Sequence, residues 1–180
     1  MASEAISPID GRYKNKVKGL ENYFSDYALT KERVKVVIAW FKHLAIFDDE
    51  NKHNKYPFYK LMDIYYNFNK NDYKEIKKIE SLTNHDIKAV VDWVVTKLPE
   101  EVSSLSYYVH FGCTSEDVNS LAYASLEYRF FNDMWIPLIY RLIKKLDDII
   151  TTERNHLMLA RTHGQAATVT TVGREMAVFN

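Results

Sequence analysis

Apolar side chains recur every three or four residues along most of this chain, a spacing typical of amphipathic helices. Before residue 110 the apolar positions form separate stripes: Val34, Val37, Ile38, Phe41 and Leu44; Phe58, Leu61, Met62 and Tyr65; Ile76 and Ile79; Ile87, Val90, Val91, Val94 and Leu98. Thr30, Pro57 and Asn84 stand where helices would begin. The pattern predicts short helices that form a small N-terminal domain over residues 1–109.

A longer helical pattern starts at Thr114. Its apolar positions are Val118, Leu121, Ala122, Leu126 and Phe130, followed after Pro137 by Leu138, Leu142, Leu146 and Ile149. Proline has no backbone N–H to donate, so Pro137 is expected to kink or interrupt this helix. We find no convincing run of alternating residues that would form strands. The expected fold is therefore all-α, with residues 110–180 forming a long helical bundle.

The charge balance, the cysteine count and the lack of long apolar runs indicate which partners and which compartment to expect. The 180 residues include 24 basic and 24 acidic side chains, so the net charge favours neither nucleic acid nor an anionic membrane. The single cysteine, Cys113, cannot form an internal disulfide and suits a reducing compartment. No apolar run reaches the roughly 18 residues of a membrane helix, and residues 1–5 lack the features of a secretory signal. We expect a cytoplasmic protein with no membrane or nucleic-acid partner.

Residues 7–13, Ser-Pro-Ile-Asp-Gly-Arg-Tyr, have two interpretations. Proline and the Asp-Gly pair are strong turn formers, so the segment can be a plain turn. Alternatively, the planar guanidinium of Arg12 and the neighbouring hydroxyl of Tyr13 can bind a carboxylate or a phosphate. The residues by themselves leave both interpretations open.

Residues 83–86, Thr-Asn-His-Asp, stand before a helical stripe. Asn84 or Thr83 can cap that helix by accepting its free backbone N–H groups, and Asp86 complements the positive end of the helix dipole. These roles leave His85 unexplained, because a cation is unfavourable at a helix N-terminus. A neutral His85 that hydrogen-bonds a ligand is therefore the alternative to a purely structural cap.

Residues 110–117, His-Phe-Gly-Cys-Thr-Ser-Glu-Asp, precede the long helix. Thr114 and Asp117 fit a capping box, which is a sufficient structural explanation. A glycine followed by the hydroxyls of Thr114 and Ser115 at a helix N-terminus is also typical of an anion site. The two acidic residues that follow disfavour a full phosphate and favour a carboxylate, while His110 is expected to pack against its neighbours.

His163 lies in a polar segment, residues 161–167, that we expect to form a loop between two helices, with the second helix starting near Thr170. Histidine has an ordinary pKa of about 6.5 and can therefore give and take protons near neutrality. The structural alternative is a solvated polar turn. The chain has no His-x-x-x-His metal spacing, glycine-rich phosphate loop, serine nucleophile elbow or nucleic-acid module. With those kinds of site excluded, these residues are compatible with a metal-free site for proton transfer or elimination.

Together these segments resemble the N-terminal part of the adenylosuccinate lyase family, within the fumarase/aspartase superfamily. The resemblance lies in residues 7–13, 83–90, 110–119 and 161–167, which occur in the family's order along nearly all of the chain. The opening segment is similar to this family rather than to fumarase, aspartase or argininosuccinate lyase. Two positions depart from the pattern: Ala166 stands where proline is usual, and Arg174 stands where lysine is common.

The resemblance implies an enzyme that releases fumarate from adenylosuccinate by β-elimination, giving AMP, and likewise from the succinylated imidazole-carboxamide ribotide of purine biosynthesis. It implies His163 as the general acid for the leaving nitrogen, with a serine on a loop far downstream as the base. The residues that would contact substrate are Arg12, Tyr13, Asn84, His85, Asp86, Thr114 and Ser115. Thr114 and Ser115 would bind the succinyl carboxylates, and no metal or cofactor is implied.

The family forms a homotetramer whose active sites draw residues from three subunits. The resemblance therefore implies that residues 1–180 alone are inactive. Two alternatives stay open: another fumarate-releasing lyase of the superfamily, and a non-catalytic helical interaction module whose polar motifs are only helix caps.

Overall fold

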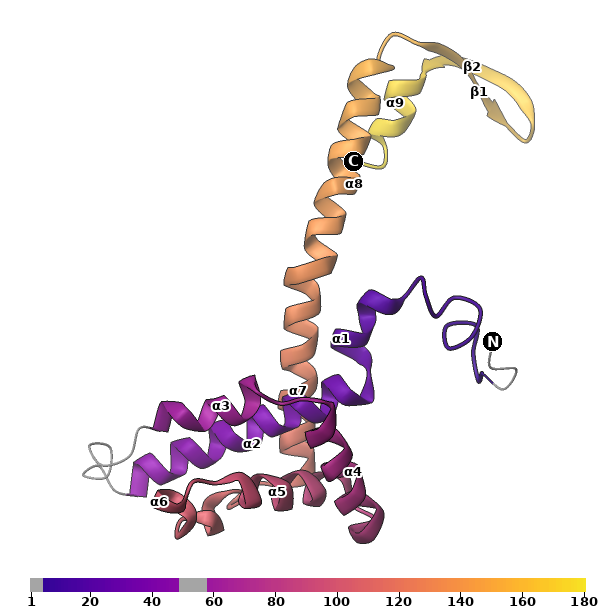
Figure 1. Ribbon diagram of the computed structural model, residues 1–180. Helices are drawn as coiled ribbons and strands as arrows, with labels where there is room; N and C mark the ends of the chain where they lie inside the picture. Colours follow the sequence, from indigo (N-terminus) through magenta and orange to yellow (C-terminus); the bar gives the residue numbers. More distant parts are fainter. Residues whose placement is uncertain (1–4, 49–57) are drawn as a thin grey trace. The chain divides into compact units, whose positions relative to one another are not determined.

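The computed structural model describes residues 5–48 and 58–180. They divide into two compact units, of which the first ends at Tyr128 and the second is Arg129–Asn180. Helices make up most of both units (Figure 1), which confirms the prediction of a mainly all-α fold; the exception is a two-stranded sheet in the second unit. The domain boundary expected at residue 110 stays a prediction.

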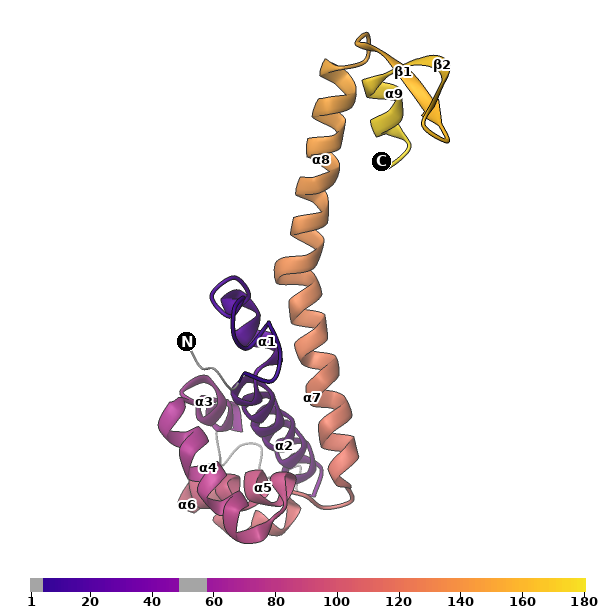
Figure 2. The same ribbon diagram turned by 90° about the vertical axis from the view of Figure 1, so that its right-hand side faces the viewer.

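The first unit consists of short helices around the long helix α2. Its elements are the 3-10 turns η1 (Lys18–Leu20), η3 (Phe58–Lys60) and η4 (Ser106–Tyr108) and the helices α1 (Glu21–Phe24), α2 (Asp26–Asp48), α3 (Leu61–Tyr66), α4 (Lys70–Thr83), α5 (Asp86–Lys97), α6 (Glu100–Ser103) and α7 (Ser115–Phe130). Helix α2 packs against α3 and α5, and α4 packs against α5. Figure 2 shows α7 beside α2. Pro57, expected at the start of a helix, lies outside the described residues.

The core of this unit is formed by the predicted apolar stripes. Fully buried side chains include Val34, Val37, Ile38 and Phe41 of α2, Leu61 of α3, Ile76 of α4, and Ile87, Val90 and Val94 of α5. Helix α2 begins earlier than predicted, because Oγ of Ser25 accepts a hydrogen bond from the backbone N–H of Ala28 (3.1 Å) and so caps the helix. Thr30, expected as that cap, is instead buried inside the helix.

A carboxylate is fully buried in this unit. Glu32 of α2 is fully buried and accepts hydrogen bonds from the hydroxyls of Tyr65 and Ser125 (2.9 Å each) and from the ammonium of Lys35 (3.1 Å). Burial by itself raises the pKa of the Glu32 carboxyl, but these hydrogen bonds and the charge of Lys35 outweigh it, and the pKa lies below its ordinary value. The carboxylate thus joins α2 to α3 and α7.

We expect Glu32→Gln to lower the free energy of unfolding near neutral pH by about 2 kcal/mol, because buried charge-assisted hydrogen bonds are lost. A carboxyl whose pKa is lower in the folded protein stabilises the fold above its unfolded pKa of about 4.3, and this contribution disappears as the pH falls through the folded value. Urea unfolding from neutral pH to about pH 3 should therefore show less acid destabilisation in Glu32→Gln than in the wild type.

The matched control for this experiment is Glu101→Gln, which removes an exposed carboxyl of α6. It should unfold like the wild type at every pH. A Glu32→Gln variant that loses stability on acidification as steeply as the wild type would contradict the role given to the buried carboxylate.

The second unit contains a π-helical turn, η5 (Phe131–Trp135), that continues directly into α8 (Ile136–Thr152). Pro137 is the second residue of α8, and without an N–H it cannot donate to a carbonyl of the preceding π turn. The wider π turn lies just before the proline ring. The chain stays helical through Pro137, with a local change in the type of helix where a kink or an interruption was expected.

A β-hairpin follows α8, where the sequence predicts only a polar loop. It consists of the antiparallel strands β1 (Leu157–Thr162) and β2 (Gln165–Thr171), joined by His163 and Gly164 (Figure 1). The φ angles of these two residues, 50° and 74°, are the left-handed values of a type I′ turn, which suits the twist of paired strands. The prediction that the chain has no strands is wrong here, because the β-branched residues 168–171 favour extended backbone.

Helix α9 (Val172–Ala177) packs back on α8. Oγ1 of Thr171 caps it by accepting a hydrogen bond from the backbone N–H of Arg174 (3.2 Å), which confirms the predicted start of this helix. The backbone N–H of Gly173 donates to the carbonyl of Glu153 (3.1 Å), so the first turn of α9 lies directly against the end of α8.

Candidate active site

The predicted segment 83–86 forms the tight junction between α4 and α5. Asn84 ends α4 in the left-handed conformation (φ 51°), which asparagine adopts more readily than most residues. His85 is the N-cap of α5, because its Nδ1 accepts a hydrogen bond from the backbone N–H of Lys88 (3.3 Å). The prediction that Asn84 or Thr83 caps this helix is therefore wrong. His85, which the sequence left without a structural explanation, therefore has a structural role as a helix cap.

The cap also sets the tautomer of the His85 ring. Because Nδ1 accepts from the Lys88 amide, hydrogen-bond geometry assigns the ring proton to Nε2. Nε2 lies 3.4 Å from Oγ of Ser115, the first residue of α7, so the ring can donate to this hydroxyl. Oδ1 of Asp86 lies 3.6 Å from the same Nδ1, farther than the backbone nitrogen of Lys88.

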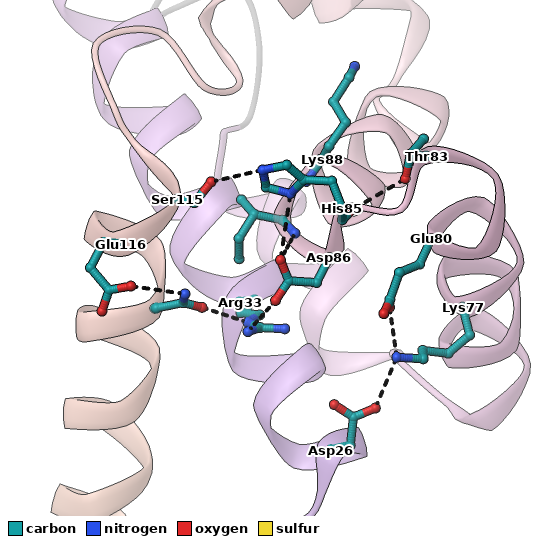
Figure 3. Close-up of polar contacts among 12 residues, drawn as sticks. Asp26, Arg33, Lys77, Glu80, Thr83, His85, Asp86, Lys88, Ser115 and Glu116 are labelled. Carbon is teal, nitrogen blue, oxygen red and sulfur yellow. Dashed lines mark hydrogen bonds and ion pairs between the residues drawn. The ribbon is translucent and has the colours of Figure 1, made fainter.

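Arg33 connects the N-terminus of α5 to α7. Its side chain is buried on α2, with Nη2 2.7 Å from Oδ2 of Asp86 and with Nε donating to Oδ1 of Asn119 at 3.0 Å (Figure 3). The other oxygen of Asp86, Oδ1, accepts the backbone N–H of Ile87 (2.8 Å). Both carboxylate oxygens of Asp86 therefore have partners within the protein, and Arg33 balances the negative charge.

Thr114 and Ser115 lie at the N-terminus of α7. The backbone N–H of Thr114 donates to Oδ2 of Asp117 (2.7 Å), which is the acidic half of the predicted capping box. Just before them, Gly112 has a φ of 72°, a conformation that residues with side chains rarely adopt. The hydroxyl of Ser115 and the Nε2 of His85 thus stand together where the helix also presents free backbone donors.

His110 and Cys113 are half-buried beside this helix and line an apolar cavity of about 620 Å³ between α2 and α7. Burial lowers the pKa of the His110 ring, and the electrostatic interactions with His85 and Lys88 lower it further, against the opposite effect of Asp117. Burial and Asp117 raise the pKa of the Cys113 thiol. Both groups are held uncharged near neutrality, which agrees with the packing role predicted for His110.

An open, polar hollow of about 660 Å³ lies beside the His85 cap. Its lining residues are Lys77, Glu80, Ser81, Asn84, His85 and Asp86. The ammonium of Lys77 bridges the carboxylates of Glu80 (2.7 Å) and Asp26 (3.3 Å) along one side (Figure 3). Three of the predicted substrate contacts, Asn84, His85 and Asp86, therefore line one hollow.

Arg12 and Tyr13 belong to an exposed turn near the start of the chain. The backbone N–H of Tyr13 donates to the carbonyl of Pro8 (2.8 Å), and the guanidinium of Arg12 lies over the Tyr13 ring, 5.5 Å from its centroid. The turn predicted for residues 7–13 is confirmed. Contact of these two side chains with a substrate stays a prediction.

His163 lies at the tip of the hairpin in the second unit. Its side chain is exposed, and the left-handed backbone at His163 and Gly164 turns the chain between the two strands. Arg161 and Gln165 flank the turn, one on each strand. The imidazole of His163 is thus accessible at the end of two paired strands. The role of His163 as an acid stays a prediction.

Arg33 is the residue of this region that the sequence analysis missed. Its partner Asn119 lies 86 positions further along the chain, so no local spacing rule connects them. The available signal was an arginine placed immediately before the buried stripe that begins at Val34, where a charged side chain needs a partner to be buried.

We expect His85→Ala to lower the free energy of unfolding by about 1 kcal/mol, because the Lys88 amide loses its cap. His85→Asn should restore most of this loss, because asparagine is among the best N-cap residues, although it removes the Nε2 that faces Ser115. Urea unfolding of the two variants beside the wild type measures the effect. Equal stabilities for all three proteins would contradict the capping role.

Residues 11–180 match the model of the lyase family, so the chain belongs to this family. None of the described helices combines the length and the apolar character needed to cross a membrane. Among the described residues, no group of three or more His, Cys, Asp or Glu side chains is arranged to hold a metal ion.

Three relatives of this chain are adenylosuccinate lyases. The sequence is 41% identical over 187 residues to that of Legionella pneumophila (strain Corby), covering 99% of this chain and 40% of the relative. It is 42% identical over 188 residues to that of Dictyostelium discoideum (97% and 39% covered) and 38% identical over 181 residues to that of Escherichia coli strain K12 (96% and 39%). The chain thus spans about 40% of the length of the curated relatives it matches.

Proposed function

We propose that this chain is the N-terminal part of an adenylosuccinate lyase, an enzyme that breaks a C–N bond by β-elimination and releases fumarate from adenylosuccinate to give AMP. The same chemistry would act on the succinylated imidazole-carboxamide ribotide of purine biosynthesis. The observation that carries the proposal is the 41% identity to a curated adenylosuccinate lyase over 99% of this chain.

The proposed substrate contacts agree with the chemistry of the α5–α7 region. β-Elimination next to a carboxylate develops negative charge, which fixed hydrogen-bond donors can stabilise. Thr114 and Ser115 are proposed to bind a succinyl carboxylate at the N-terminus of α7, with Nε2–H of His85 beside them. The pairing of Asp86 with Arg33 supports this role, because an uncompensated carboxylate would repel an anionic substrate. Asn84 and Asp86 are proposed to contact the substrate from the hollow beside the His85 cap.

The remaining roles complete the proposal. Arg12 and Tyr13 would contribute a guanidinium and a hydroxyl to the substrate, and His163 would protonate the leaving nitrogen as general acid. A serine on a loop beyond residue 180 would be the base, and no cofactor is required. Residues 110–180 are proposed to begin the central bundle of a cytoplasmic homotetramer with shared active sites, so residues 1–180 alone would be inactive.

The test is fumarate release by the purified full-length wild-type protein, given adenylosuccinate or argininosuccinate in separate assays. We expect fumarate and AMP from adenylosuccinate and no turnover of argininosuccinate. Turnover of argininosuccinate alone would favour another fumarate-releasing lyase of the superfamily. No fumarate from either compound, with a folded protein, would favour the non-catalytic interaction module.

A further inference from the structure

The guanidinium of Arg33 is shared between two helices that carry proposed substrate contacts. Only 7% of the residue is exposed, and it lies on α2, which packs in the core of the first unit. Its Nη2 bonds Oδ2 of Asp86 at 2.7 Å, while its Nε bonds Oδ1 of Asn119 at 3.0 Å (Figure 3). A planar guanidinium holds its donors in a fixed fork, so these two contacts fix the two helices relative to each other.

The contact between Arg33 and Asn119 connects Arg33 to the proposed carboxylate site, because Asn119 and Ser115 belong to the same helix. Asn119 lies four residues after Ser115 in α7, so the two residues share one face of that helix. The amide of Asn119 is oriented from its other side, because Nδ2 donates to Oε2 of Glu116 (3.3 Å). Oδ1 therefore faces Arg33, and this contact holds α7 about one turn after Ser115.

A second contact also joins the N-terminus of α5 to α7. Nε2 of His85 lies 3.4 Å from Oγ of Ser115, which is long for a hydrogen bond and weak by itself. The Arg33–Asp86 contact is shorter, charge-assisted and largely shielded from water on the Arg33 side, so it is the stronger of the two. Of these two polar links, the one through Arg33 is therefore the stronger.

We propose that Arg33 is a positioning residue of the active site: through Asp86 and Asn119 it sets the spacing between the His85 end of α5 and the Ser115 end of α7, and with it the fit of the substrate's succinyl group. This inference rests on the proposed function. Arg33 touches no substrate; it acts on groups that do.

Arg33→Lys tests the fork without removing the charge. A lysine ammonium can still pair with Asp86 but is a single point, so it does not hold Asn119 in the same arrangement. We expect KM for adenylosuccinate to rise about tenfold, which corresponds to about 1.4 kcal/mol of lost binding. Asn119→Ala should raise KM to a similar extent from the other side of the tether. The double variant should be no worse than either single one, because both remove the same link.

The control is Lys97→Gln, which breaks an ion pair of similar length (2.9 Å to Glu75) at the opposite end of α5. It should leave KM unchanged. KM does not depend on how much enzyme is folded, so a merely structural role for Arg33 would reduce the yield of active enzyme or its melting temperature and leave KM at the wild-type value.

The outcomes separate this inference from the proposed function. A wild-type enzyme that releases fumarate, together with wild-type KM values in Arg33→Lys and Asn119→Ala, would overturn the positioning role alone. Additive KM increases in the double variant would overturn it too. A wild type that releases no fumarate would overturn the proposed function and this inference with it. Where Arg33→Lys does not fold, Asn119→Ala and its KM decide the question.

Discussion

Replacing His163 by asparagine is expected to lower the rate of fumarate release by the full-length protein about a hundredfold or more, the usual contribution of a general acid. The substitution removes the proton donor but suits the backbone. His163 and Gly164 occupy a two-residue turn with φ values of 50° and 74°, and Asn-Gly is the preferred pair for such a type I′ turn. The measurement is kcat with adenylosuccinate, beside circular dichroism to show that the hairpin is folded.

The matched control is His156→Asn in the same unit. His156 is an exposed histidine whose Nδ1 pairs with Oε2 of Glu153 (2.8 Å), outside the proposed site. Because an exposed side-chain contact of this kind contributes little, this variant should keep close to wild-type kcat. A His163→Asn enzyme with undiminished kcat would refute the acid role, whereas a fall in both variants would point to damage of the second unit rather than to chemistry.

Adding one methyl group at Gly173 is expected to cost about 3 kcal/mol of folding free energy, at the upper end for overpacking. A Cβ built there would lie 2.7 Å from the Cα of Arg154, 2.7 Å from the carbonyl oxygen of Ile150 and 2.9 Å from the backbone N of Arg154. All three are backbone atoms, so no side-chain rotation relieves the clash. Helix α9 would have to move away from α8, which would break the hydrogen bond from Gly173 to Glu153.

The control for this prediction is Arg174→Ala, the next residue of α9, which is exposed. It also places alanine in the first turn of the helix, yet should change the free energy of unfolding by no more than about 0.5 kcal/mol. Urea unfolding monitored by far-UV circular dichroism compares the two variants. A Gly173→Ala protein as stable as Arg174→Ala would show that α8 and α9 are not packed as closely as described.

The helices and part of their capping could be predicted because the signals are local. The spacing of Val34, Val37, Ile38 and Phe41 places one face of α2 in the core, and each of these side chains is buried. Asp117 caps α7 from within the same eight residues that predict it. Periodicity and capping depend on neighbours three or four positions apart, which is why they can be read from the chain.

Two local predictions failed, for different reasons. Thr83, Asn84 and His85 can each accept a backbone N–H, and the left-handed turn at Asn84 gives the cap of α5 to His85. The segment around His163 looks like a polar loop because polar side chains stand on both sides of the His-Gly pair. Its β-branched residues and the His-Gly turn become decisive only when the two strands pair.

The sequence by itself determined the helical stripes, the turn at residues 7–13 and the order of the polar motifs, since these follow from neighbouring residues. Only the tertiary structure decided that His85 faces Ser115, that Glu32 is a buried carboxylate and that Arg33 joins Asp86 to Asn119. The physical reason is that a charge can be buried only where distant segments supply its partners, and those partners meet when the helices pack.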